Sequence, residues 1–128
     1  MKILFHIDEE SKWQEVLGNV KNVIKEGNEH GESYIIEVAA NGNAVTALNE
    51  KAAVNLNLLV DLAELSKTGV VFAACNNSLN KFAMNKSDIL PFIQVVPAGV
   101  VEIAKKQDQG YSYIKPWVYK KYNTIRLP

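Results

Sequence analysis

The segment GVVFAACNNSL, residues 69–79, decides the fold of this chain. The six residues from Val70 to Cys75 carry no charge. Gly69 precedes this run and the polar Asn76-Asn77-Ser78 follows it, a pattern that predicts a strand buried on both faces. A short helix to about Phe82 is expected directly after the strand, because Asn and Ser favour helix starts.

Similar apolar runs occur on both sides of this segment and alternate with amphipathic stretches. Further strands are expected over 2–7, 34–40, 92–96 and 111–114, and longer helices over 11–27, 55–65 and 99–109. Uncharged strands that alternate with helices are typical of a parallel sheet covered on both faces. The sequence therefore predicts an α/β fold, a three-layer α/β/α sandwich with a mainly parallel sheet of about five strands.

Local signals give expected boundaries and faces for these helices. Ser11 and Gln14 match a capping box, so the first helix should begin at Ser11, with Gly27 as its stop. The inward faces are expected to carry Leu58, Leu59, Leu62 and Leu65 in the second helix, and Val100, Ile103 and Ala104 in the third.

Composition excludes several classes of protein. The 128 residues suit one domain, expected over residues 1–116, and the 48% hydrophobic content with zero net charge excludes disorder. The one cysteine excludes an internal disulfide and a zinc site of several cysteines. No apolar run reaches the roughly 18 residues of a membrane span, and no signal peptide is evident. We therefore expect a cytoplasmic protein without membrane contact.

Residues 117–128 differ in character and are expected to form a basic, aromatic C-terminal arm. Residues 1–108 hold 10 basic and 14 acidic side chains, whereas residues 109–128, which include this arm, hold four basic residues and no acid. Basic residues interleaved with aromatic ones can bind single-stranded nucleic acid. The short run favours instead an arm that packs on the domain or on a neighbouring subunit, and so a homo-oligomer rather than a nucleic-acid partner.

Ligands of parallel α/β sheets bind beyond the carboxyl ends of the strands. The segments that follow the expected strands are 8–10, 41–43, 75–77, 97–99 and 115–117, so Cys75 lies at this edge. The candidate pocket residues are Asp8, Asn41, Gly42, Asn76, Asn77, Ser78, Pro97 and Gly99.

Cys75 is the candidate catalytic residue, with two interpretations. A free cysteine is often an inert buried side chain. The following Asn76-Asn77-Ser78, however, would place free helix amides near the sulfur and lower its pKa, which gives a reactive thiolate. A cysteine hydrolase is disfavoured, because His6 is expected to pack within the first strand and His30 to lie in a solvated turn.

Other chemistry has little support in the sequence. Neither of the glycine-rich phosphate motifs is present, and no cluster has metal-ligand spacing. The acidic residues 8–10 could bind a cation, but negative charge in the first turn of a helix is the usual explanation for such residues. No metal and no cofactor are expected.

Four segments together resemble the DsrE/DsrF-like sulfur-relay family. They are FHIDEE-x-x-W (5–13), the strand that ends in Asn41-Gly42, GVVFAACNNSL (69–79) and VVPAGVVEIAKKQDQGYSYIKP (95–116). The resemblance covers residues 2–116, and its most specific part is the segment around Cys75. At Asn43 relatives commonly have a proline.

The resemblance implies a parallel α/β/α sheet and assembly into homo-trimers, hexamers or related oligomers. Several members carry sulfur as a persulfide on a cysteine equivalent to Cys75, whereas others have no established activity. Asp8, Asn77, Pro97 and Gly99 match positions that line the same edge. The leading hypothesis is a persulfide carrier that exchanges sulfur with donor and acceptor proteins through Cys75. The alternative is a non-enzymatic oligomeric module that binds a small ligand or a protein.

Overall fold

A computed structural model describes residues 1–116, which form one five-stranded sheet. The strands are β1 (Lys2–Ile7), β2 (Ile35–Ala40), β3 (Val71–Cys75), β4 (Gln94–Val96) and β5 (Ser112–Ile114). Their order is β4-β3-β2-β1-β5 and every neighbouring pair is parallel, which confirms the predicted α/β fold. The predicted C-terminal arm, 117–128, lies outside the described residues.

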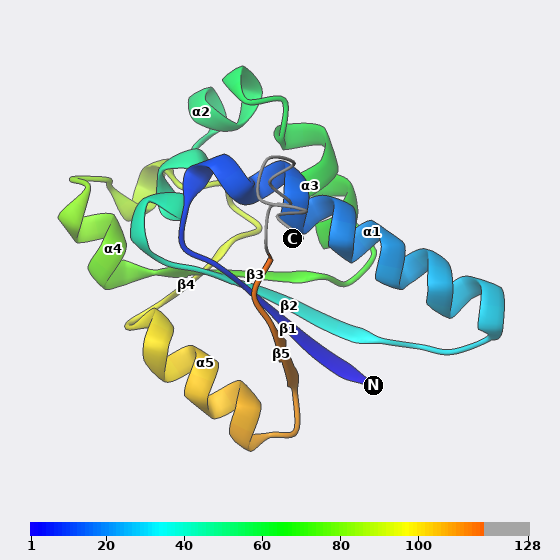
Figure 1. Ribbon diagram of the computed structural model, residues 1–128. Coiled ribbons are helices and arrows are strands. Elements are labelled where there is room, and N and C mark those ends of the chain that lie inside the picture. The colour runs from blue at the N-terminus through cyan, green and yellow to red at the C-terminus, as the bar shows by residue number, and fades with distance from the viewer. Residues whose placement is uncertain (117–128) are drawn as a thin grey trace, which may run out of the picture.

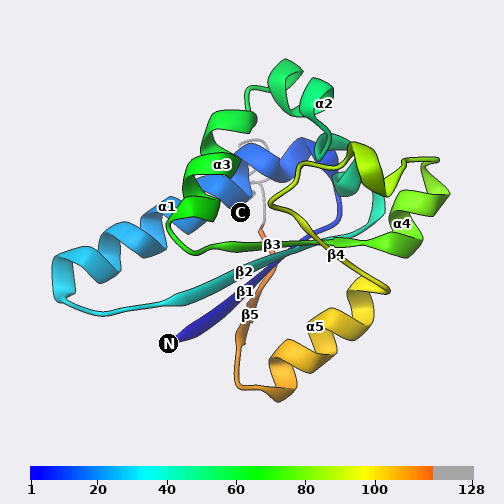
Figure 2. The same cartoon turned by 180° about the vertical axis from the view of Figure 1, so that it is seen from behind.

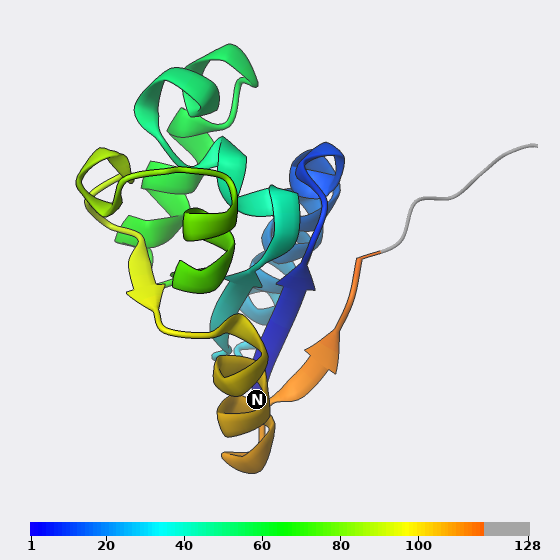
Figure 3. The ribbon, with the colours of Figure 1, turned by 90° about the vertical axis from the view of Figure 1, so that its left-hand side faces the viewer.

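The helices lie in two layers on opposite sides of the sheet (Figure 1). One side carries α1 (Trp13–His30), α2 (Glu50–Asn55) and α3 (Leu59–Lys67), and the other carries α5 (Gly99–Asp108). The short α4 (Asn76–Lys81) directly continues β3. Figure 2 shows the same separation from behind, and Figure 3 shows β5 beside β1 at one edge of the sheet.

The two faces of the sheet differ in chemistry. Ile3, Phe5 and Ile7 of β1 belong to the main apolar core, together with the buried Trp13 and Phe72. Because side chains alternate along a strand, the opposite face carries the other set of residues, and this is the face toward α5. It comprises Leu4, His6, Glu37, Ala39, Ala73 and Cys75.

The capping-box prediction for α1 is wrong. Ser11 lies in a 3-10 turn, Glu10–Lys12, and the helix begins at Trp13 without a side-chain cap. The helix also continues past Gly27 to His30 and ends at Gly31, whose φ of 67° suits glycine. Gly27 is needed for close packing instead, because a Cβ there would lie 2.7 Å from the carbonyl oxygen of Glu32.

The helix predicted over 55–65 begins later than expected, because α3 runs from Leu59 to Lys67, and a separate short helix, α2, ends at Asn55. Asn57 between them adopts a left-handed φ of 58°, a conformation that asparagine tolerates better than most residues. The side chain of Asn49 caps α2 by accepting a hydrogen bond of 2.8 Å from the amide of Ala52. Leu58, Leu62 and Leu65 are buried as predicted.

The predicted inward face of α5 is right for Ile103 and wrong for Val100 and Ala104, which are exposed. Val100 is 67% exposed, whereas Gly99 is buried and Glu102, Ile103 and Lys106 are half-buried against the sheet. The reason is the buried Glu37 on β2, whose carboxylate lies 3.8 Å from the Lys106 ammonium. Of the helices in the described part of the chain, none combines the length and the apolar content needed to cross a membrane.

Candidate functional site

Cys75 is the last residue of β3, and α4 begins with the residue after it. Its side chain is buried, with 6% of its surface exposed. The groups beside the sulfur that lower the pKa of the thiol are the hydroxyl of Ser78 and the backbone amides of Asn77, Ser78 and Gly99. The sulfur therefore lies in a small polar nest, largely shielded from solvent within one chain.

These surroundings change the acidity of the thiol. Burial raises the pKa of Cys75, but the hydroxyl of Ser78 and the three backbone amides outweigh it and bring the pKa below its ordinary value. The thiolate is the nucleophilic form of cysteine. The lowered pKa increases the thiolate fraction at a given pH, which is the direction predicted from Asn76-Asn77-Ser78, and the Gly99 amide adds to the effect.

Gly99 reaches the sulfur because it has no side chain. A Cβ at this position would lie 3.1 Å from the Cβ of Cys75 and 3.2 Å from the Cβ of Asn41, closer than ordinary contacts. A larger residue would force the start of α5 away from the sheet, and its amide away from the sulfur. Gly99 therefore joins α5 to the site.

Ser78 is oriented by the loop after β2. The amide of Gly42 donates a hydrogen bond of 2.9 Å to the Ser78 hydroxyl oxygen, which leaves the hydroxyl proton for the sulfur. Gly42 has a φ of 57°, and a Cβ there would meet the carbonyl oxygen of Asp8 at 2.8 Å. Three strand ends, after β1, β2 and β3, are thereby packed against one another.

Asp8 lies at the same edge and pairs with a residue that the sequence analysis did not select. The Lys115 ammonium donates a hydrogen bond of 2.8 Å to the Asp8 carboxylate. This hydrogen bond is the main reason that the pKa of Asp8 lies below its ordinary value, with the charges of Lys115, His6 and Lys12 adding to the effect. Lys115 directly follows β5, so its position after the carboxyl end of a strand could have identified it as a site residue from the sequence.

His6 makes polar contacts that the expectation of simple packing missed. Its ring is half-buried, with Nε2 at 2.8 Å from Asn41 Oδ1 and Nδ1 at 2.6 Å from the hydroxyl of Tyr113. The sequence could have indicated these contacts, because side chains alternate along β1 and His6 therefore lies on the same face of the sheet as Cys75.

The remaining candidates lie at the same edge without a described bond to the sulfur. Asn76 is half-buried at the start of α4, and Pro97 is exposed just after β4. The structure thus brings Asn41, Asn77, Ser78 and Gly99 close to Cys75, and it packs Gly42 against Ser78 and Asp8.

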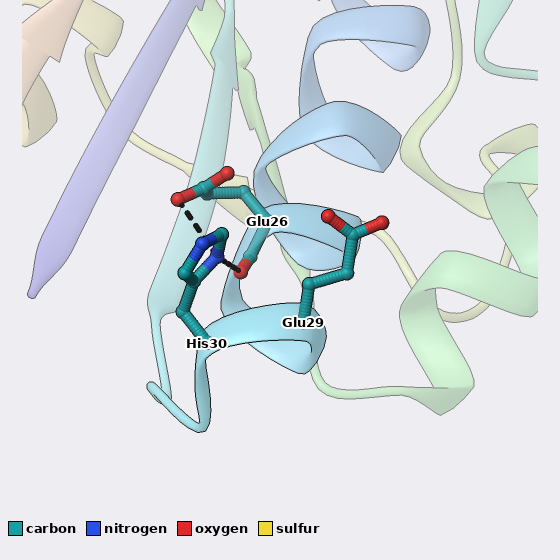
Figure 4. Close-up of side chains that lie close together, drawn as sticks. All are labelled: Glu26, Glu29 and His30. Carbon is teal, nitrogen blue, oxygen red and sulfur yellow. Dashed lines mark hydrogen bonds and ion pairs between the residues drawn. The ribbon is translucent and has the colours of Figure 1, made fainter.

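One cluster of potential metal ligands, Glu26, Glu29 and His30, lies at the far end of α1 (Figure 4). All three side chains are exposed. His30 Nδ1 lies 3.0 Å from the carbonyl oxygen of Glu26 and 3.1 Å from its carboxylate, while Glu29 pairs with Lys25 at 3.9 Å. These are ordinary contacts of a solvated helix end; His30 is exposed as expected, but it lies in the last turn of α1 and not in a loop.

Comparison with known proteins agrees with this architecture. The family model described as the DsrE/DsrF-like family matches residues 1–116. A solved structure, the protein of unknown function MTH1491 from Methanobacterium thermoautotrophicum, is 34% identical with a TM-score of 0.78. The match covers 90% of this chain and 98% of that one. The curated proteins contain no match. From the family match and the shared fold, this chain belongs to the DsrE/DsrF-like family.

Proposed function

We propose that this protein carries sulfane sulfur as a persulfide on Cys75. One observation supports this above the others: the Ser78 hydroxyl and the backbone amides of Asn77, Ser78 and Gly99 lower the pKa of Cys75 although the side chain is buried. A thiol that only fills space needs no such set of donors. Donors of this kind stabilise a thiolate, and they would stabilise a persulfide anion in the same way.

The proposed reaction has two steps of thiol exchange. The Cys75 thiolate attacks the outer sulfur of a donor persulfide, the donor S–S bond breaks, and the donor leaves as a thiolate with the electron pair of that bond. An acceptor thiolate then attacks the outer sulfur on Cys75, and Cys75 returns to the thiolate. No oxidant or reductant is consumed, and each step depends on thiolate character.

Both exchange partners must come from outside the chain that carries the sulfur. Cys75 is the only cysteine of the sequence, so an internal disulfide cannot release the product. We therefore propose protein thiols as donor and acceptor, in the cytoplasm, where thiols stay reduced.

Sulfur loading tests this proposal directly. The protein is incubated with inorganic polysulfide, desalted and weighed intact by mass spectrometry, and a low-mass thiol is then added as acceptor. We expect an adduct of one sulfur atom on the wild type, its removal by the thiol, and no adduct on Cys75→Ser. A wild type that stays unmodified, or an equal adduct on Cys75→Ser, contradicts the proposal.

The burial of Cys75 favours a second candidate, a binding module without sulfur chemistry. With 6% of the side chain exposed, Cys75 could serve as the floor of a ligand site. The loading experiment separates the two functions, because a binding module would leave Cys75 unmodified while the protein remains folded.

A further inference from the structure

A chain of hydrogen bonds crosses the carboxyl edge of the sheet toward Cys75. It begins at Tyr113 on β5, whose hydroxyl lies 2.6 Å from Nδ1 of His6 on β1. It continues from His6 Nε2 to Oδ1 of Asn41, directly after β2, at 2.8 Å. The function proposed above does not yet use these contacts.

The chemistry of the three groups determines the direction of the bonds. An amide oxygen can only accept, so His6 Nε2 carries a proton in both the neutral and the charged ring. In the neutral ring Nδ1 then has no proton and accepts from the Tyr113 hydroxyl. The oxygen of Asn41 is thus occupied, and its two N–H donors remain for other partners.

Asn41 lies next to Cys75, with only Gly99 between them. The Cβ atoms of Asn41 and Cys75 lie 3.2 and 3.1 Å from the point where a Cβ of Gly99 would be. Asn41 is half-buried, and among residues 1–116 its side chain makes one hydrogen bond, through Oδ1 to His6. Its N–H donors are therefore available to a second group placed beside the sulfur.

We propose that His6 and Tyr113 are positioning residues that hold the Asn41 amide in one orientation, and that its NH2 group makes the site selective for anionic sulfur compounds. The inference rests on the proposed function and narrows its substrate class to sulfane-sulfur donors that carry a negative charge apart from the sulfur to be transferred. A donor held with its charge on the Asn41 NH2 group has its outer sulfur beside the Cys75 thiolate. Without His6 the amide could turn its oxygen toward the same space and repel an anion.

The test compares two alkylating reagents that differ in charge, iodoacetate and iodoacetamide. Their rate-constant ratio at Cys75 is measured at one pH and compared with the ratio in urea-unfolded protein. We expect a higher ratio in the folded wild type and a fall of about tenfold in Asn41→Asp, because a like charge a few ångströms away repels the anionic reagent. His6→Phe and the milder Tyr113→Phe should each lower the ratio about threefold.

Matched variants separate this effect from a general structural one. Asn43→Asp adds the same charge on an exposed side chain of the same loop and should keep the wild-type ratio. Circular dichroism confirms that each variant is folded. In an Asn41→Ala background, His6→Phe should have no further effect, because His6 acts through Asn41.

An equal ratio in Asn41→Asp and Asn43→Asp overturns the inference, as does a His6→Phe effect that persists in the Asn41→Ala background. The readout requires no sulfur transfer. A wild type that shows the expected ratios but never loads sulfur would therefore refute the proposed function and still support the anion selectivity.

Discussion

At the scale of single residues, the site depends on places where a side chain is absent as much as on those where one is present. Gly99 allows its amide to reach the Cys75 sulfur, and Gly42 allows its amide to orient Ser78. Both glycines were selected from the sequence only by their position after an expected strand. Both matter because the backbone there approaches another strand end closely.

Two glycine substitutions make this argument testable. Gly99→Ala should destabilise the protein by about 1–3 kcal/mol, because the new Cβ meets those of Cys75 and Asn41 at 3.1 and 3.2 Å. Gly18→Ala is the matched control, since nothing lies within 4 Å of its Cβ position in α1. It should stabilise by about 0.5–1 kcal/mol through helix propensity. Urea unfolding measures both, and equal effects would refute the packing argument.

At the scale of elements, α5 is bound to the sheet through charged groups rather than through an apolar stripe. Glu37 is 3% exposed, and its Oε2 atom has no hydrogen-bond partner among the described residues. The Lys106 ammonium lies 3.8 Å from the carboxylates of both Glu37 and Glu102, so the two acidic groups face the same cation. Burial and a second carboxyl group close by both disfavour the charged form of Glu37.

This pair makes stability depend on pH. Burial and the neighbouring Glu102 raise the pKa of Glu37 from its ordinary 4.5 to about 8. Between these values the folded protein keeps a proton that the unfolded chain releases, so the free energy of unfolding should fall as pH rises through this window. Glu37→Gln cannot ionise and should lose that fall, so its stability relative to the wild type should increase from about pH 5 to pH 8.

Urea unfolding of both proteins across this pH range checks the prediction. The exposed Glu15→Gln on α1 serves as control and should keep the wild-type pH dependence. Parallel stability curves for Glu37→Gln and the wild type would contradict the assigned ionisation of Glu37.

At the scale of the whole molecule, we propose that α5 forms an interface between copies of this chain. The outer surface of α5 presents Val100 and Val101, which are 67% and 48% exposed. Tyr113 in strand β5 of the sheet is 39% exposed. Adjacent exposed apolar residues of this kind mark association sites. An oligomer, expected to be a trimer or hexamer, would bury them close to Gly99 and so close to the sulfur site.

Light scattering at micromolar concentration should show an oligomer for the wild type and a smaller species for Val101→Lys. Val60→Lys on α3 is the control, because Val60 is 68% exposed on the opposite side of the sheet. A monomeric wild type, or equal dissociation in both variants, would exclude α5 as the interface.

The sequence by itself determined the five strands, their parallel arrangement and the place of Cys75 at a carboxyl strand end. These features follow from local properties, since uncharged runs and polar breaks lie within a few residues of one another. Helix boundaries were predicted less well: the Ser11 capping box is not used, and the left-handed Asn57 delays the start of the helix expected from residue 55 to Leu59.

Only the tertiary structure decided which groups surround the sulfur and which helix face turns inward. The strand order β4-β3-β2-β1-β5 places β1 and β2 next to β3, and α5 across all three, which no local pattern specifies. This arrangement brings the Gly99 amide to Cys75, joins His6 to Asn41 and Tyr113, and sets Lys106 over the buried Glu37. Each of these contacts joins residues far apart in the chain, so its energy depends on the packed fold.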